Sequence, residues 1–406
     1  MKSTFFCSNK YFLAGIILFL ILWISACTPS GDSTPPPSAP TNLTAIGSLG
    51  NIHLSWSAST GSVGGYNIYR STDDVTFEKI NTAVVSATSY DDAISSPDGD
   101  GVFYYYKVTA TDALESDYSN TVKNIHGTRL DASYLSGFTT DAALSPYVAE
   151  ESVVVEGGDL TIATGTKLYI LDDVTVDIEQ SRVFMVHGLL RVLASTTDPA
   201  AFTSHVAGGG ALTGSQGFRL AIVNAVDYAN SSNSGTLIQN TRITNMESWD
   251  GGGGDTITIN GCKPKLYNLY ITASAASAAI MNINSDSGAI IQNCSFTNLY
   301  ASVSGDQTST GFQMDHNIFT LVFWDYVLEF VYSSTPPVND GQIANNTFNG
   351  SGELDLSEMT GGGNILLGNN YWQQGLPSTT IQNGSNQTPV YTPALSSAPA
   401  GVGPTW

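Results

Sequence analysis

A pattern of six positions recurs through the C-terminal half of the chain. In each copy the first and sixth positions are apolar, a spacer stands second, and Asn or a substitute stands third; the copies lie at 238–243, 266–271, 291–296, 314–319, 343–348 and 367–372. The third positions, which are 23 to 29 residues apart, are Asn240, Asn268, Asn293, His316, Asn345 and Asn369. Self-similarity at such a period is typical of a solenoid, in which each repeat forms one coil.

A coil of this length cannot bury its own apolar face, so it must stack on the next coil, with strands about 4.8 Å apart. We therefore expect short strands in each coil, with the first and sixth positions pointing inward and the third position in the turn between two strands. Asn tolerates the left-handed backbone of a tight turn, and stacked amides can hydrogen-bond to the coils above and below. The third positions are thus predicted to form a structural ladder.

His316 interrupts this ladder. An imidazole can replace the amide as donor and acceptor, and no second His or Cys aligns with it. We interpret His316 as structural, with metal binding as the alternative.

Brief β-type segments precede the recurrence. The sequences at 158–166 (Gly-Asp-Leu-Thr-Ile-Ala-Thr-Gly-Thr), 187–192 (His-Gly-Leu-Leu-Arg-Val) and 201–204 (Ala-Phe-Thr-Ser) resemble the opening coils of exported right-handed parallel β-helix proteins, the pectate-lyase-like superfold. Asn-Asn-Tyr-Trp at 369–372 resembles a segment of their last coils. This resemblance implies a right-handed parallel β-helix with terminal caps over residues 126–406, but it specifies function poorly.

Residues 39–125 follow a different pattern, in which short alternating strands are broken by turn residues. Apolar residues alternate along two of these strands, namely Ile52, Leu54 and Trp56 in one and Tyr104, Tyr106, Val108 and Ala110 in the other. Such strands predict a β-sandwich. Trp56, the run at 65–70 and the Tyr-x-Tyr-x-Val-x-Ala run resemble a fibronectin type III domain, which implies a spacer or binding module. The expected fold class of the whole chain is therefore all-β.

The amino terminus is expected to be an export signal at residues 1–26. Lys2 and Lys10 form a basic leader, and residues 11–24 are an uncharged apolar run that is short for a membrane span. Ile-Ser-Ala-Cys at 24–27 resembles the bacterial lipobox, which implies that Cys27 is lipidated and becomes the mature amino terminus. Residues 27–38, rich in Pro, Ser and Thr, then form a tether. We expect the protein in the cell envelope, at the outer membrane or cell surface.

Charge narrows the choice of partners. The 406 residues include 35 Asp and Glu against 14 Lys and Arg, which gives a formal net charge of -21. A surface of that sign repels phosphate and polyuronate backbones unless a cation intervenes, so nucleic acid is excluded as a partner. Polysaccharides and cell-surface proteins remain.

Metal and disulfide chemistry have little support in the sequence. The five His are scattered, and neither His-x-x-x-His nor Cys-x-x-Cys occurs, so we predict no zinc or copper site. Cys262 and Cys294 would share an oxidising compartment, but they do not align in the recurrence, and a disulfide between them stays open.

A second strand follows each ladder turn. If its apolar residues face the core, Thr258, Asn282, Glu329 and Asp355 form an outward column, with Glu353 two residues from Asp355. Neighbouring carboxylates about 5 Å apart suit a retaining glycosidase, with Glu329, Asp355 and Glu353 as catalytic candidates, and a cluster of three suits Ca²⁺. The alternative is a solvated acidic face without chemistry.

Aromatic residues stand close to this column in the sequence. Trp324 and Tyr326 come just before the Glu329 strand, and Trp249 has nearly the same offset in an earlier coil. Exposed rings of this kind form platforms for the apolar faces of sugars. Alternation with Leu328 and Phe330 favours a core position for Trp324 and Tyr326 instead.

These features predict a surface-anchored lipoprotein that binds extended partners, glycans above all, through the β-helix. One alternative is a polysaccharide lyase or glycoside hydrolase, and another is a structural or adhesion module. The pectinolytic motifs of the superfold, such as Gly-His-Gly, Trp-x-Asp-His and Arg-x-Pro-x-x-Arg, are missing. Their absence weighs against catalysis of the pectinase type.

Overall fold

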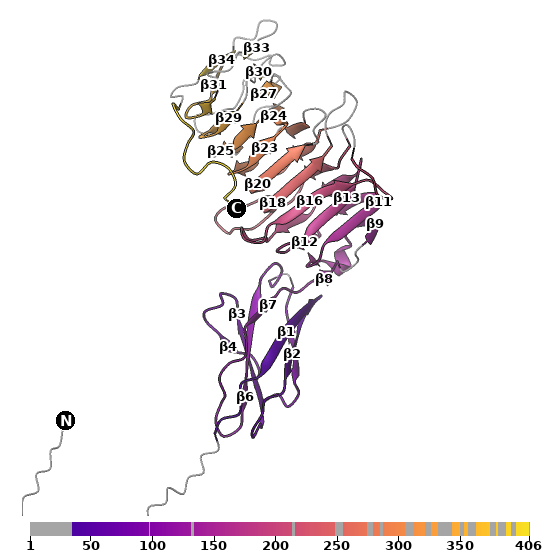
Figure 1. The fold of residues 1–406 in the computed structure, drawn as a ribbon, viewed down its shortest axis with the longest axis vertical. Coiled ribbons are helices and arrows are strands. Elements are labelled where there is room, and N and C mark those ends of the chain that lie inside the picture. Colours follow the sequence, from indigo (N-terminus) through magenta and orange to yellow (C-terminus); the bar gives the residue numbers. More distant parts are fainter. Residues whose placement is uncertain are drawn as a thin grey trace, which may run out of the picture. The chain divides into compact units, whose positions relative to one another are not determined.

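The computed structural model describes residues 35–96, 98–130, 134–212, 216–247, 255–273, 279–284, 287–304, 312–320, 326–331, 343–349, 353–355, 363–373, 379–380, 387–390 and 395–405. Apart from the 3-10 helix η2 (Ala142–Leu144), the described chain is built from strands (Figure 1). Within these ranges no helix is long and apolar enough to cross a membrane. Two compact units make up the chain: Met1–Thr44, Ser55–Tyr90 and Tyr105–Val122 form one, and Ala45–Leu54, Asp91–Tyr104 and Lys123–Trp406 form the other.

Strands β1 to β7 form the two sheets of a sandwich. One sheet has the order β1 (Thr41–Ser48), β2 (Asn51–Ser57), β5 (Ser89–Ala93), and the other has the order β4 (Glu78–Lys79), β3 (Gly65–Ser71), β6 (Tyr104–Thr111), β7 (Val122–Asn124). Along β2, Ile52, Leu54 and Trp56 are buried and alternate with half-exposed residues, as predicted. The Trp56 ring meets the Tyr66 ring edge to face, with centroids 5.2 Å apart, and so joins the two sheets. Assignment to the fibronectin type III class stays a prediction.

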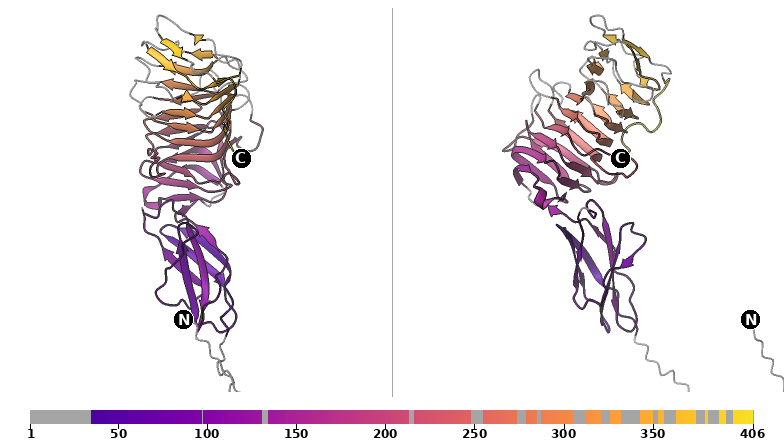
Figure 2. Two further views of the ribbon diagram at one scale, coloured as in Figure 1. Left: turned by 90° about the vertical axis from the view of Figure 1, so that its left-hand side faces the viewer. Right: turned by 180° about the vertical axis from the view of Figure 1, so that it is seen from behind.

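The remaining strands form a parallel β-helix with three sheets, named A, B and C below (Figure 2). Sheet A contains β8 (Thr128–Arg129), β10 (Tyr147–Ala149), β12 (Lys167–Ile170), β15 (Leu189–Val192), the first halves of β18 (Leu237–Met246) and β20 (Lys265–Ala273), β22 (Ile290–Gln292), β25 (Gln313–Asp315) and β28 (Ile343–Ala344). Sheet B contains the first part of β9 (Tyr134–Thr139), the first half of β11 (Val153–Ile162), β13 (Thr175–Glu179), β16 (Ala200–His205), the second halves of β18 and β20, β23 (Ser295–Thr297), β26 (Ile318–Thr320), β29 (Thr347–Asn349) and β32 (Tyr371–Trp372). The end of β9 pairs with the second half of β11, which belongs to sheet C. Sheet C contains the second half of β11, β14 (Val183–Val186), β17 (Arg219–Val223), β19 (Ile257–Asn260), β21 (Ala279–Ile283), β24 (Leu299–Ser304), β27 (Tyr326–Val331), β30 (Glu353–Asp355) and β33 (Thr379–Thr380).

One further parallel pair, β31 (Gly363–Leu366) with β34 (Gln387–Val390), lies near the C-terminal end of the solenoid. The all-β fold class and the parallel β-helix predicted from the recurrence are therefore confirmed.

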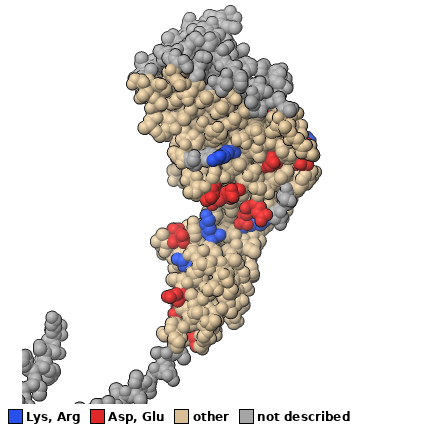
Figure 3. Space-filling view, in the orientation of Figure 1, with Lys and Arg blue, Asp and Glu red and all other residues tan. Residues whose placement is uncertain are grey.

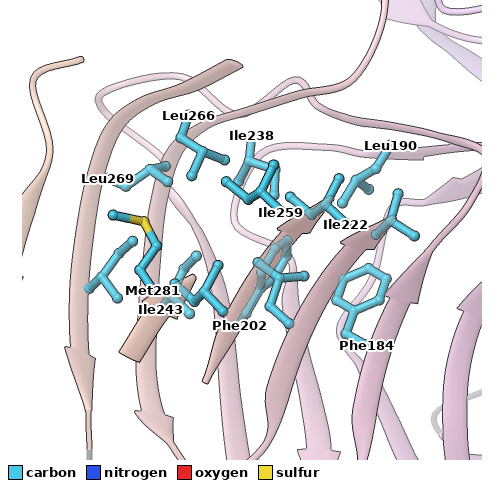
Figure 4. Close-up of a cluster of buried hydrophobic side chains, with 14 of the residues drawn as sticks. Phe184, Leu190, Phe202, Ile222, Ile238, Ile243, Ile259, Leu266, Leu269 and Met281 are labelled. Carbon is cyan, nitrogen blue, oxygen red and sulfur yellow. The ribbon is translucent and has the colours of Figure 1, made fainter. Parts of the chain in front are cut away.

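The described coils share one cluster of buried apolar side chains, part of which Figure 4 shows. The first positions of the recurrence are all buried, and they are Ile238, Leu266, Ile291, Met314, Ile343 and Leu367. The sixth positions are also buried, and they are Ile243, Ile271, Phe296, Phe319, Phe348 and Trp372. The last four of these residues are aromatic, and their rings stack in chain order with centroids 4.7, 5.2 and 4.3 Å apart. The inward direction predicted for both positions is confirmed.

The third positions have the backbone that the pattern predicted. All six residues, His316 included, have φ between 48° and 58°, in the left-handed region where Asn is enriched. In this column the Asn268 Nδ2 atom donates to Asn240 Oδ1 at 2.6 Å.

A continuous amide ladder lies one residue further along. Asn317, Asn346 and Asn370 are fully buried. Asn317 Nδ2 donates to Asn346 Oδ1 at 3.0 Å, and Asn346 Nδ2 donates to Asn370 Oδ1 at 3.1 Å. The backbone N–H groups of Asn317 and Asn346 donate to the same two oxygens. The buried amide therefore changes position along the solenoid. It stands at the third position in the coils of Asn240 and Asn268, as predicted, and at the fourth in the coils of Asn317, Asn346 and Asn370.

Cys262 and Cys294 are both buried free thiols, which answers the question of a disulfide. Burial raises the pKa of Cys294 to about 12, so its thiol stays protonated. It contributes packing rather than a cross-link.

Replacing Asn346 with Ala should destabilise the β-helix strongly. The change takes the side-chain partner from the Asn317 N–H and from Met314 O, both on the preceding coil. Each buried group left unpaired costs about 1–3 kcal/mol. We expect the free energy of unfolding, measured in urea, to fall by about 3 kcal/mol or more. Gln313→Ala, which truncates an exposed amide side chain on β25, should change it by less than about 0.5 kcal/mol. Equal effects of the two changes would contradict the ladder's role.

Candidate functional site

A polar column crosses five successive strands of sheet C. Thr258 on β19 pairs with Asn282 on β21, which pairs with Ser302 on β24. Ser302 pairs with Glu329 on β27, and Glu329 pairs with Asp355 on β30. The predicted adjacency of Glu329 and Asp355 in register is therefore confirmed, and the structure inserts Ser302 into the column that the sequence predicted.

The other predicted site residues are only partly described. Glu353 pairs with Tyr326, and the register shifts between Tyr326 and Leu328. For β27 and β30 the structure describes the backbone alone, so catalytic roles for Glu329, Asp355 and Glu353, bound Ca²⁺ and a sugar platform at Tyr326 stay predictions. Trp249, Trp324 and the predicted lipidation site Cys27 lie outside the described residues.

Asp255 adds a carboxylate beside the start of this column. The Asn282 Nδ2 atom donates to Asp255 Oδ2 at 2.9 Å. Burial raises the pKa of Asp255 above its usual value, and hydrogen bonds from Asn282 and Thr258 offset part of that rise. Sequence reasoning missed Asp255 because it follows a glycine run and stands outside the strand alternation; its position just before β19 was the available signal.

A cavity of about 330 Å³ opens beside the turn between sheets A and B. Its lining residues are Gln292, Asn293, Asp315, His316, Ala400 and Gly401. The His316 Nδ1 atom lies 2.8 Å from Asp315 Oδ2, and Asn345 Nδ2 donates to Asp315 Oδ1 at 2.9 Å. The imidazole is thereby oriented by a carboxylate inside a polar concave site, a setting that the ladder interpretation of His316 did not anticipate.

Residues 395–405, called the C-terminal strap below, cover this turn column (Figures 1 and 2). Leu395 donates its N–H to Asn370 O, Gly403 donates to His316 O, and Thr405 donates to Asn268 Oδ1, at 3.0, 3.0 and 2.8 Å. The strap therefore runs back across several coils and supplies one wall of the cavity.

A third polar cluster lies on sheet B around His205. His205 Nδ1 is 3.0 Å from Asp177 Oδ1, and its Nε2 is 2.9 Å from Glu156 Oε1. Glu179, which pairs with His205 in register, is bound by Arg182. Burial lowers the pKa of His205, but the hydrogen bonds and charges of Asp177 and Glu156 outweigh it, so the net pKa is raised.

Across the part of the chain that the structure describes, no group of three or more His, Cys, Asp or Glu side chains is arranged to hold a metal ion.

Comparison with known proteins finds local likenesses. No family model matches the chain. An amylopullulanase from Thermoanaerobacterium saccharolyticum is 32% identical over 96 residues, which are 23% of this chain and 7% of that protein. A β-1,2-glucanase structure from Parabacteroides distasonis is 32% identical over 23% of this chain and 13% of that chain, with a TM-score of 0.20. A pectate lyase from Erwinia chrysanthemi in complex with tetragalacturonic acid is 12% identical over 92% of this chain and 95% of that chain, with a TM-score of 0.18.

The raised pKa of His205 predicts a pH-dependent contribution to stability. A group whose pKa is higher in the folded state stabilises it fully below the unfolded value of about 6.5, and that stabilisation is lost as the pH rises through the folded pKa. The loss of unfolding free energy caused by His205→Gln should therefore be larger at pH 5.5 than at pH 8.5, measured by urea denaturation. Thr320→Ala is an uncharged change on the same sheet, and the change in unfolding free energy that it causes should not depend on pH. An effect of His205→Gln that grows with pH would contradict the assignment.

Proposed function

We propose that this protein is a lipoprotein of the cell surface whose β-helix binds extended glycans. The observation that carries the proposal is the column Thr258, Asn282, Ser302, Glu329 and Asp355, which holds one polar residue at the same register position on five successive coils.

A column of this kind suits an extended polymer. Parallel strands repeat about every 4.8 Å. The half-exposed Thr258 and Asn282 therefore offer a hydroxyl and an amide on neighbouring coils. Ser302 on the next coil is buried, and Glu329 and Asp355 follow at the same register position. Sugar hydroxyls both donate and accept hydrogen bonds, and such side chains satisfy both needs. A glycan lying along the axis would contact several coils at once.

Charge supports a neutral glycan over a uronate or a nucleic acid. The formal net charge is -21, which repels anionic polymers. On the face drawn in Figure 3, charged side chains are sparse on the described surface. The local likeness to a protein named amylopullulanase is in keeping with a carbohydrate-related function.

The second candidate is a polysaccharide-cleaving enzyme. It is favoured by the register that sets Glu329 beside Asp355 on adjacent strands, the arrangement that a carboxylate pair requires. The missing pectinolytic motifs weigh against it, and a structural or adhesion module without glycan affinity is the third candidate.

Substitutions in the column separate these functions. Asn282→Ala removes a half-exposed amide and should weaken glycan binding about tenfold, the effect of one hydrogen bond of about 1.4 kcal/mol. Glu329→Gln and Asp355→Asn should each retain binding, measured on a glycan array and by affinity electrophoresis. Thr297→Ala on sheet B is the control and should bind as the parent does.

Two results would overturn the binding proposal. Release of soluble sugars that stops in Glu329→Gln or Asp355→Asn would establish the enzyme instead. An array without signal for any glycan would favour the structural module.

Lipidation at Cys27 has its own test. Cys27→Ser removes the thiol that accepts the lipid, so incorporation of labelled palmitate and recovery in the membrane fraction should both be lost. Cys262→Ser, at a buried thiol of the β-helix, is the matched control and should keep the label. Equal labelling of Cys27→Ser and the parent protein would refute a lipid anchor at this residue.

A further inference from the structure

A row of outward residues crosses sheet A, on a different side of the solenoid from the sheet C column. Gln239 pairs with Tyr267, Tyr267 with Gln292, and Gln292 with Asp315. Each is half-exposed and comes directly after a buried residue of the same strand. Residues paired in a parallel sheet point the same way, so the row places an aromatic ring one coil from the cavity that Gln292 and Asp315 line.

The cavity combines acceptors with mixed donor and acceptor groups. Asp315, when ionised, only accepts, and each of its oxygens keeps a lone pair beyond the contacts with Asn345 and His316. In the neutral tautomer whose Nδ1–H donates to Asp315, Nε2 of His316 is an acceptor. The amides of Gln292 and Asn293 both donate and accept.

These hydrogen-bond donors and acceptors favour neutral ligands over anionic ones. Hydroxyl groups donate to the carboxylate and the imidazole, and they accept from the two amides. A uronate or phosphate group would meet the Asp315 carboxylate, and none of the cavity's described lining residues is Lys or Arg. At about 330 Å³, the cavity is near the lower end of the range of small-ligand sites, which is roughly 300–1,000 Å³.

The neighbouring Tyr267 extends the site along the solenoid. Its ring lies on the coil before Gln292, and Lys265 Nζ is 5.1 Å from the ring centroid. Because the Lys265 ammonium lies over one face of this half-exposed ring, a pyranose would stack on the other face. A glycan residue in the cavity would therefore have a stacking position for the next residue of its chain.

The strap makes the cavity concave. Ala400 and Gly401 line it, and Gly403 is bound to His316 O close to them. Gly403 has φ 83°, and a Cβ atom there would lie 2.7 Å from Ile318 Cδ1, so the close approach of the strap depends on glycine. The wall formed by the strap is thus fixed to the same coil that supplies His316.

We infer that the cavity of Gln292, Asn293, Asp315 and His316 under the C-terminal strap is a second glycan site, which holds one neutral sugar residue while Tyr267 stacks on the next. The inference rests on the proposed glycan binding, but it uses a different sheet and different residues. It assigns His316 a ligand-contacting role in addition to its place in the turn column.

Chemical protection of His316 tests the site directly. The full-length protein in detergent is treated with diethyl pyrocarbonate, and modification of each His is quantified by peptide mass spectrometry. Maltohexaose, cellohexaose and mannohexaose are the neutral probes, and hexagalacturonate is the anionic probe. We expect at least one neutral probe to slow modification of His316 about tenfold at saturation, while His53, a half-exposed His on the sandwich strand β2, reacts at an unchanged rate.

Variants of the cavity residues test whether the probe that protects His316 also binds through them. His316→Asn installs the residue that five other coils carry at positive φ, so the fold is kept while the imidazole is lost. His316→Asn, Asp315→Asn and Tyr267→Ala should each weaken binding of the protecting probe about tenfold. Gly403→Ala should weaken it by displacing the strap, and Thr297→Ala should leave it unchanged.

The outcomes separate this inference from the proposed function. Unchanged modification of His316 with every neutral probe overturns the inference, and glycan binding that is then lost in Asn282→Ala leaves the sheet C proposal intact. If a neutral probe protects His316 while Asn282→Ala binds glycan normally, the cavity is supported as a glycan site and the sheet C column is ruled out as one. Protection by hexagalacturonate equal to that by the neutral probes overturns the charge selection.

Discussion

The structure depends on coil-to-coil pairing at constant register. Each coil exposes unpaired backbone groups and apolar side chains at both of its edges, and only the next coil satisfies them. Inside the turn, buried amides make this pairing strict, because Asn317, Asn346 and Asn370 hydrogen-bond to one another and to the backbone of neighbouring coils. A slip of one residue would leave these groups unpaired in an apolar interior and would turn every strand inside out.

Constant register also determines which side chains lie next to one another on the outer surface. Residues at one register position line up on successive coils, so each sheet acquires its own chemistry. Sheet C carries the polar column that ends in Glu329 and Asp355. Sheet B holds the charged cluster of His205, Asp177 and Glu156, and sheet A carries the row that leads to the cavity. Regular stacking explains why these groups are aligned. Which residue types stand at the outward positions is not fixed by stacking, so those residues can serve a function.

The C-terminal strap departs from this regularity and makes the surface of the β-helix concave at the cavity. A strand face alone is nearly flat, which gives a ligand contacts on one side only. Because the strap crosses the turn column and binds His316 O and Asn268 Oδ1, it builds a second wall opposite polar side chains. The cavity thus joins residues from widely separated parts of the sequence, such as Asn293 and Gly401.

The sequence by itself determined the solenoid, the inward positions and the left-handed turns, because each follows from local periodicity and from the backbone preference of Asn. It also determined that Glu329 and Asp355 share a register position, since both stand at the same step of alternation. Its amide ladder is found at the third position for Asn240 and Asn268, but one residue later for Asn317, Asn346 and Asn370, since Asn pairs such as Asn345 and Asn346 hide which amide is buried. The spacer position that holds Gln292 and Asp315 carried no periodic signal. Only the tertiary structure decided that His316 faces a cavity, because the strap that closes it reaches those coils through space and not through any repeat.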